Sequence, residues 1–224
     1  PDEVSTLRSF WIFNGLVLEA TPSVIEKVAK RKDVAYVKED EWISIQTNTA
    51  EPEATLTSVE WNIQKINADD VWDLGYTGQG VIVGNVDTGV DATHPALSGK
   101  FTGYWHDATW SGCSTPCDDV GHGTHTMGTI LGGDGPGPFT NDIGVAPGAQ
   151  FVAAKAFWYG FGMTSWLLDC MEWIGDLVGQ GVNVRVVSNS WGNCDQTDQT
   201  FWNAVLTWRN LGIIPVFAIG NSSN

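Results

Sequence analysis

Residues 81–89 read Val-Ile-Val-Gly-Asn-Val-Asp-Thr-Gly, and residues 121–128 read Gly-His-Gly-Thr-His-Thr-Met-Gly. The first stretch is an apolar run that ends in an acid, as expected for a buried strand with Asp87 at its carboxyl end. The second stretch places His122 between two glycines at an expected helix start, where small neighbours let a substrate backbone approach the ring. Because an imidazole N–H can hold a buried carboxylate in its charged form, Asp87 and His122 are candidates for a catalytic pair.

The chain around these two stretches alternates apolar strands with amphipathic helices. Strands are expected at 81–86, 151–156, 184–188 and 213–219, and helices at 122–130, 165–179 and 199–210. This alternation predicts an α/β fold, a parallel sheet with helices on both faces. Active sites of such sheets lie just past the carboxyl ends of the strands, where Asp87 falls.

The first 46 residues have a different pattern. Two strands at 5–13 and 16–20 flank Asn14-Gly15, a strong hairpin signal, and a helix is expected from Pro22 with Thr21 as its N-cap. A further strand is expected at 34–37, which makes a small α+β ferredoxin-like unit that would need another strand and helix before it. Residues 47–58 are polar without periodicity and predict a linker. The expected domains are therefore 1–46, 47–58 and 59–224.

The net charge of −15 lies almost entirely beyond residue 46. An acidic body of this kind repels nucleic acid and anionic membrane, so neither is expected as a partner. A solubilising surface is the ordinary interpretation of the charge, and cation binding is the alternative. No apolar run approaches the ~18 residues of a membrane helix. The opening Pro-Asp-Glu is unlike a signal peptide, so we expect that an export signal precedes the chain or was removed.

Four cysteines are candidates for disulfides, since an even number in an exported protein favours pairing. They are Cys113, Cys117, Cys170 and Cys194, and their order along the chain leaves three pairings open. Zinc binding by Cys113 and Cys117 is an alternative, although no second pair of ligands with suitable spacing supports it.

Asn221 follows the last expected strand. Its amide can donate to an oxyanion, a contact worth about 2.7–4 kcal/mol where it has been removed; a left-handed turn after Gly220 explains it equally well. Ser190-Trp191-Gly192 follows the strand at 184–188 and can present backbone groups to an added peptide strand, or can simply be a strand exit.

His125 lies three residues after His122, which raises the question of a metal site. Zinc-binding helices pair histidines four residues apart with a glutamate, which this stretch lacks. A metallohydrolase that uses His122, His125 and Asp87 is therefore a minor alternative, and we expect His125 to pack beneath the His122 ring.

Taken in order, the motifs Asp87-Thr-Gly, Gly-His122-Gly-Thr-His, Ser190-Trp-Gly and Gly-Asn221 resemble those of the subtilisin-like serine proteases, the subtilases, over residues 60–224. The resemblance implies a secreted serine endopeptidase in which Asp87 orients His122 and His122 acts as general base and then general acid. It also implies that Asn221 completes the oxyanion hole. Ser190, Trp191 and Gly192 would line the substrate strand and the specificity pocket.

The same resemblance makes residues 5–46 the later part of an inhibitory propeptide, with the maturation cut between Ile45 and Ser58. The implied partners are protein or peptide substrates and the chain's own propeptide, and the implied state is a monomer. No cofactor is needed for the chemistry. Structural calcium is possible at an unassigned site, but Ala96 cannot act as the calcium-ligating Asp that many subtilases place after His94-Pro95.

The serine nucleophile of the family is expected in a Gly-Thr-Ser context about 150 residues beyond the histidine, past about residue 270. The 224-residue sequence has no serine in that context, and Ser222 and Ser223 are too close to Asn221 to take the role. We therefore expect a zymogen fragment that does not catalyse by the triad route alone. A naturally inactive binding module of subtilase fold is the alternative.

Overall fold

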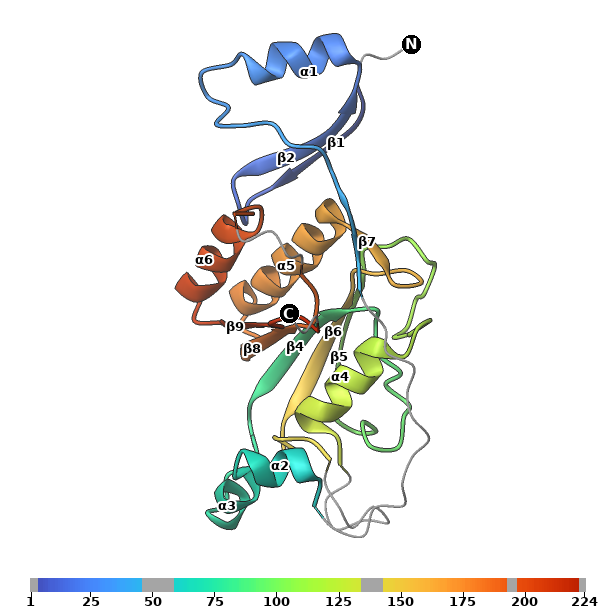
Figure 1. The fold of residues 1–224 in the computed structure, drawn as a ribbon, viewed down its shortest axis with the longest axis vertical. Helices are drawn as coiled ribbons and strands as arrows, with labels where there is room; N and C mark the ends of the chain where they lie inside the picture. The colour runs from blue at the N-terminus through green and yellow to red at the C-terminus, as the bar shows by residue number, and fades with distance from the viewer. Residues whose placement is uncertain (1–3, 46–58, 134–142, 193–196, 222–224) are drawn as a thin grey trace.

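The computed structural model describes residues 4–45, 59–133, 143–192 and 197–221. Its centre is a five-stranded parallel sheet in the order β5 (Phe101–Asp107), β6 (Gln150–Lys155), β4 (Ile82–Asp87), β8 (Val184–Asn189) and β9 (Ile214–Phe217). One face packs against α4 (His122–Leu131), and the other packs against α5 (Thr164–Gly179) and α6 (Trp202–Asn210) (Figure 1). The predicted parallel α/β fold is confirmed.

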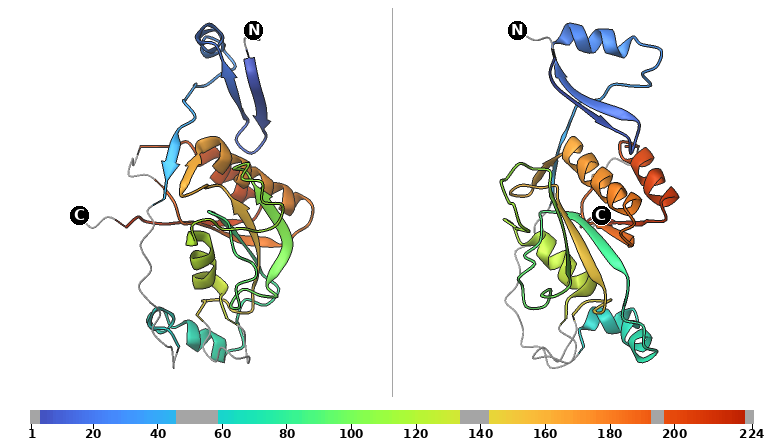
Figure 2. Two further views of the ribbon diagram at one scale, coloured as in Figure 1. Left: turned by 90° about the vertical axis from the view of Figure 1, so that its right-hand side faces the viewer. Right: turned by 180° about the vertical axis from the view of Figure 1, so that it is seen from behind.

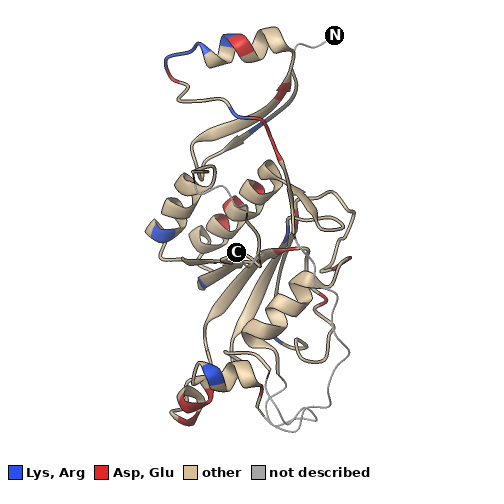
Figure 3. Cartoon of the chain, in the orientation of Figure 1, with Lys and Arg blue, Asp and Glu red and all other residues tan. Residues whose placement is uncertain are grey.

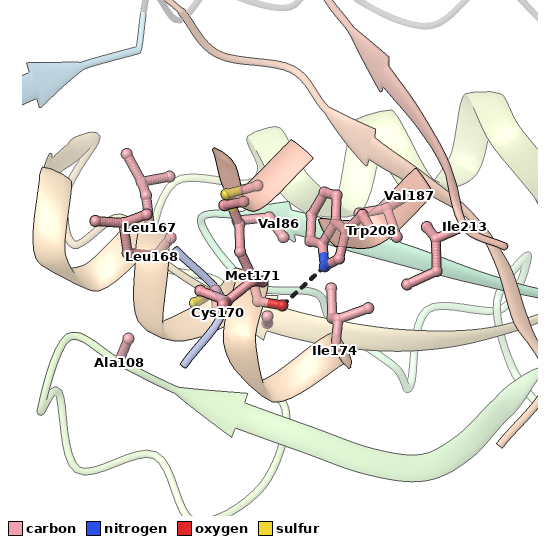
Figure 4. Packing of buried hydrophobic residues seen from close by; sticks show 14 of the residues in the cluster. Val86, Ala108, Leu167, Leu168, Cys170, Met171, Ile174, Val187, Trp208 and Ile213 are labelled. Atoms are coloured by element: carbon pink, nitrogen blue, oxygen red, sulfur yellow. Dashed lines mark hydrogen bonds between the residues drawn. The ribbon is translucent and has the colours of Figure 1, made fainter. Parts of the chain in front are cut away.

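Each face of the sheet has its own hydrophobic core. The core under α4 joins Met127 and Leu131 to Phe151 of β6. The larger core on the other face joins α5 and α6 to Val86 and Val187, and Figure 4 shows the Trp208 indole at its centre. Because both faces of the sheet are buried, side chains on both sides of the central strands are apolar, and the strands are continuous apolar runs in the sequence.

The alternation of side chains along β4 decides which of its polar residues meet α4. Val83, Asn85 and Asp87 are alternate residues and point to one face, while Gly84 and Val86 point to the other. Asn85 donates from Nδ2 to the carbonyl of Gly123 and to the Thr126 hydroxyl of α4, at 3.1 and 3.2 Å. The last residue of the strand therefore faces the start of α4.

Three elements outside the predicted pattern complete this part of the chain. Two short helices, α2 (Trp61–Lys65) and α3 (Ala68–Asp73), precede the sheet, and β5 forms one of its two edges. Within the described residues, no helix has both the length and the apolar character needed to cross a membrane.

The N-terminal segment forms an antiparallel hairpin of β1 (Val4–Phe10) and β2 (Gly15–Ala20), followed by α1 (Pro22–Ala29) (Figure 2). The predicted hairpin is confirmed, and Asn14 takes the left-handed conformation, with φ of 55°, that its turn requires. The strand predicted at 34–37 is wrong. Within the described residues those positions pair with no strand, and Tyr36 and Val37 are exposed.

The next strand instead lies further along the chain. β3 (Trp42–Ser44) pairs antiparallel with β7 (Phe161–Met163), which leads into α5. Ile45 extends the pairing by donating its N–H to the Gly160 carbonyl at 3.0 Å. The N-terminal segment therefore adds an edge strand next to the main sheet rather than completing a ferredoxin-like sheet of its own.

The hairpin contacts the outer face of α5, which carries acidic residues three and four positions apart (Figure 3). Arg8 forms a forked ion pair with Asp169. One Glu172 oxygen accepts the backbone N–H groups of Trp11 and Ile12 at 2.6 and 3.1 Å. Because the spacing of 169, 172 and 176 keeps all three acids on one helix face, α5 offers the hairpin a continuous row of acceptors.

The cysteines differ in their roles. Cys113 and Cys117 form a disulfide that closes a short loop. The expectation that Cys170 forms a disulfide is wrong: its thiol is free and buried in the core beneath α5. Burial raises the pKa of the Cys170 thiol well above its usual value, as expected for a structural cysteine that behaves as an apolar residue. Cys194 lies outside the described residues.

Candidate active site

Asp87 and His122 meet where β4 ends and α4 begins. The Asp87 Oδ1 lies 2.6 Å from His122 Nδ1, and Asp87 is 1% exposed while the imidazole retains a partly open edge. Since Nδ1 faces the carboxylate, the geometry suits the tautomer with its proton on Nδ1 and leaves Nε2 free to accept a proton.

Neighbouring groups hold the Asp87 carboxylate in place. Its Oδ1 accepts the backbone N–H of Thr88 at 2.7 Å, and its Oδ2 accepts the Thr126 hydroxyl at 3.2 Å. A side chain at Gly123 would place its Cβ 2.0 Å from the Gly89 carbonyl oxygen, so only glycine lets α4 approach β4 this closely. The glycine after the histidine is therefore required by backbone packing.

Asp118, which the sequence reasoning missed, secures the start of α4. Its Oδ2 accepts the backbone N–H and the hydroxyl of Thr124 at 2.8 and 2.6 Å, and its Oδ1 accepts the Thr88 hydroxyl and the Gly121 N–H. Burial raises the pKa of Asp118, but these hydrogen bonds outweigh it and keep the pKa below its usual value. An acid four residues before the expected helix start was the available signal.

Lys155 is a second missed residue, and it lies in the strand beside β4. The last residue of β6, it is fully buried and pairs in register with Asp87. Its ammonium donates to the Thr88 carbonyl at 2.6 Å and pairs with Asp119, whose other oxygen accepts the Tyr159 N–H at 2.6 Å. The buried Lys155 ammonium therefore links the turn after Asp87, through Asp119, to the loop before β7.

The hydrogen bond that His122 donates to the Asp87 carboxylate raises the pKa of His122 above its usual value of 6.5. Burial lowers this pKa, and the charges of Asp87 and Asp118 add to the rise. In an NMR titration, we expect the pKa of His122 to lie above 6.5, the usual value for histidine. Asp87→Asn is expected to lower the pKa of His122. Because folding raises the pKa of His122, the protonated imidazole stabilises the folded protein. This contribution is fully present below the pKa of His122 in the unfolded chain, and it is lost as the pH rises through its pKa in the folded protein. A His122 pKa unaffected by Asp87→Asn would contradict this prediction.

The other predicted site residues lie at the same edge of the sheet but are not joined to this pair by a hydrogen bond in the part of the chain that the structure describes. Ser190, Trp191 and Gly192 follow β8, and Asn221 is exposed beyond β9. Trp191 is buried, with its Nε1 donating to the Val86 carbonyl at 3.0 Å and its ring against Phe201 and Phe217. Its bulk therefore fills the core, and Gly192 beside it is exposed.

His125 is exposed rather than packed beneath His122, so that expectation is wrong. The buried face of α4 carries Gly123, Met127 and Leu131, four residues apart, and position 125 falls on the opposite side of the helix. Among the residues that the structure describes, no three His, Cys, Asp or Glu side chains gather in an arrangement suited to a metal ion.

A histidine held by a buried carboxylate at the carboxyl ends of parallel strands is an arrangement that hydrolytic enzymes use for general-base catalysis. Comparison with known proteins identifies the family of this chain. The model of the subtilase family, Peptidase_S8, matches residues 78–224. The chain belongs to the subtilase family.

Several curated relatives are similar along nearly the whole chain. Bacillopeptidase F of Bacillus subtilis is 35% identical over 96% of this chain, and M-protease of Shouchella clausii is 30% identical over 98%. Subtilisin-like protease 3 of Arthroderma otae is 31% identical over 94%. The matched regions make up 17%, 52% and 50% of those proteins, so the chain spans about half of their length or less.

Proposed function

We propose that this chain supplies the Asp–His part of the catalytic triad of a secreted serine endopeptidase. The observation that carries the proposal is the 2.6 Å contact between the buried Asp87 carboxylate and His122 Nδ1. Asp87 orients the imidazole and stabilises its charged form. His122 takes the proton of the serine nucleophile through Nε2 and then delivers it to the leaving amine.

The remaining roles extend the proposal to the substrate. The nucleophile belongs to a segment beyond residue 224, and Asn221 donates its side-chain amide to the oxyanion with a backbone N–H. Ser190 and Gly192 offer backbone groups to a peptide strand beside the pocket that Trp191 borders. In this proposal the chemistry requires no cofactor, any structural calcium has no assigned site, and the enzyme acts as a monomer.

The N-terminal segment acts in this proposal as an inhibitor that is cut away between Ile45 and Ser58. Pairing of β3 with β7 and the contacts of Arg8 and Trp11 with α5 support it, because they hold residues 4–45 against the candidate catalytic part. N-terminal sequencing of the mature enzyme is expected to start within 46–58. A start before Val34 would overturn the inhibitor assignment.

The proposed activity is tested with the full-length protein. It is expected to hydrolyse casein and to lose that activity after treatment with a sulfonyl fluoride, which modifies an activated serine. Resistance to the sulfonyl fluoride together with loss of activity in a chelator would favour a metallohydrolase. Absence of hydrolysis, with a reading frame that lacks the serine, would favour a binding module of subtilase fold.

A further inference from the structure

The disulfide between Cys113 and Cys117 lies in the loop that joins β5 to α4. At one end of the segment that it closes, the Cys113 carbonyl accepts the Trp105 Nε1–H of β5 at 3.0 Å. At the other end, the Cys117 carbonyl lies against Gly89, where an added Cβ would collide with its oxygen, and Gly89 has φ of 104°. The disulfide-closed segment is therefore packed on the chain two residues after Asp87.

Asp118, the residue that follows this segment, contacts both sides of the candidate catalytic pair. It forms an isolated bridge with the same glycine, and its Oδ1 accepts the Thr88 hydroxyl at 2.8 Å. The Thr88 oxygen in turn accepts the Gly123 N–H at 2.9 Å. Because Thr88 directly follows Asp87 and Gly123 directly follows His122, the position of Asp118 determines how the carboxylate and the imidazole face each other.

The loop is held by side chains at two separate places. Asp107 accepts the Thr109 N–H and hydroxyl and the Ser111 hydroxyl, which fixes the part that leaves β5. Asp118 fixes the part that enters α4. Residues 112–117, between these two anchors, form no helix or strand. The disulfide is the covalent link across this stretch, and breaking it returns conformational freedom to the chain that carries Asp118.

We propose that the Cys113–Cys117 disulfide positions the catalytic pair through Asp118, so that its reduction lowers catalysis reversibly. The inference rests on the proposed function, in which Asp87 and His122 act together in proton transfer. Reduction leaves both residues in the chain but loosens the backbone that aligns them, and catalysis depends steeply on the alignment of the reacting groups.

A small dithiol is the reductant in this proposal. One of its thiolates attacks a cysteine sulfur, which breaks the S–S bond and forms a mixed disulfide, and its second thiol then displaces the protein sulfur. Two electrons and two protons pass to the protein, so Cys113 and Cys117 become thiols and the dithiol becomes a cyclic disulfide. Both cysteines are partly exposed beside the exposed Ser114, so the reagent reaches the bond. Cys170 is fully buried and already a free thiol.

The test compares the matured full-length enzyme in two forms. One is reduced with dithiothreitol and alkylated, and the other is alkylated without reduction. With a chromogenic peptide we expect kcat to fall about tenfold on reduction, with KM nearly unchanged, because the loop contains no residue proposed to bind substrate. The pKa of His122 in the pH profile of kcat/KM is expected to fall as its contact with Asp87 loosens. Reoxidation of a sample that was not alkylated is expected to restore kcat.

The double variant Cys113→Ser/Cys117→Ser removes the disulfide without adding an alkyl group. It is expected to reproduce the reduced enzyme and to be insensitive to dithiothreitol. Thr115→Ala is the matched control, since it changes an exposed side chain inside the same closed segment and leaves the disulfide intact. This variant is expected to have the kcat and the dithiothreitol response of the parent.

An unchanged kcat in enzyme whose disulfide is shown by mass to be open would overturn the inference. So would a further loss of activity when the double variant is treated with dithiothreitol, because another cysteine would then be responsible. Loss of the whole fold on reduction, seen by circular dichroism, would also overturn it. In each case hydrolysis by the unreduced parent would still support the protease, whereas absence of that hydrolysis would overturn the proposed function itself.

Discussion

Replacing Asp87 with Asn is expected to lower the kcat of the full-length enzyme about 10⁴-fold. The amide has nearly the same shape, so the fold and the substrate contacts remain. Its NH₂ group, however, can donate to His122 Nδ1, which favours the tautomer with the proton on Nε2. That tautomer cannot accept the proton of the nucleophile. The pKa of His122 is also expected to fall because its charged form loses the Asp87 carboxylate.

The measurement is kcat and KM for hydrolysis of a chromogenic peptide, with circular dichroism to show that the variant is folded. Asp70→Asn, on the exposed part of α3, removes the same charge away from the site and is expected to change neither constant. A folded Asp87→Asn variant within tenfold of the parent kcat would show that the 2.6 Å contact between Asp87 and His122 is structural.

The sequence was informative where one local pattern determines one structure. The apolar runs predict central strands because β4, β6 and β8 are buried on both faces. β5 was missed because its sequence, Phe-Thr-Gly-Tyr-Trp-His-Asp, has no continuous apolar run, unlike that of β9 at the other edge of the sheet. The strand at 34–37 was predicted from local composition, but a strand needs a partner, and the chain pairs β3 with β7 instead.

The residues of the candidate site also differ in how well the sequence predicts them. Asp87 and His122 could be predicted because Asp87 lies at the end of a strand and His122 at the start of a helix. The parallel sheet brings these two ends together. Lys155 and Asp119 gave no signal, since a lysine at a strand end is ordinarily exposed and their contact joins residues 36 apart in the sequence. Contacts between distant residues depend on the register of the sheet, which no local pattern specifies.

The second large effect is expected in the core between α5 and α6. Trp208 is fully buried, and Figure 4 shows its indole among Met171, Ile174 and Val187. Its Nε1 donates to the Met171 carbonyl at 2.8 Å, so one side chain fills the space between the helices and satisfies a buried backbone acceptor. Trp208→Ala leaves a cavity and removes that hydrogen bond, and is expected to lower the free energy of unfolding by about 3–5 kcal/mol.

Trp202→Ala is the matched control because Trp202 lies on the same helix and is 60% exposed. Its expected effect is within about 0.5 kcal/mol, since a largely solvated ring loses little on removal. Urea unfolding of the full-length protein, followed by circular dichroism, compares the two variants with the parent. α6 leads into β9, the strand before the proposed oxyanion residue Asn221, so the loss at Trp208 should also reduce activity. Equal destabilisation by both substitutions would contradict the assignment of Trp208 as the anchor between α5 and α6.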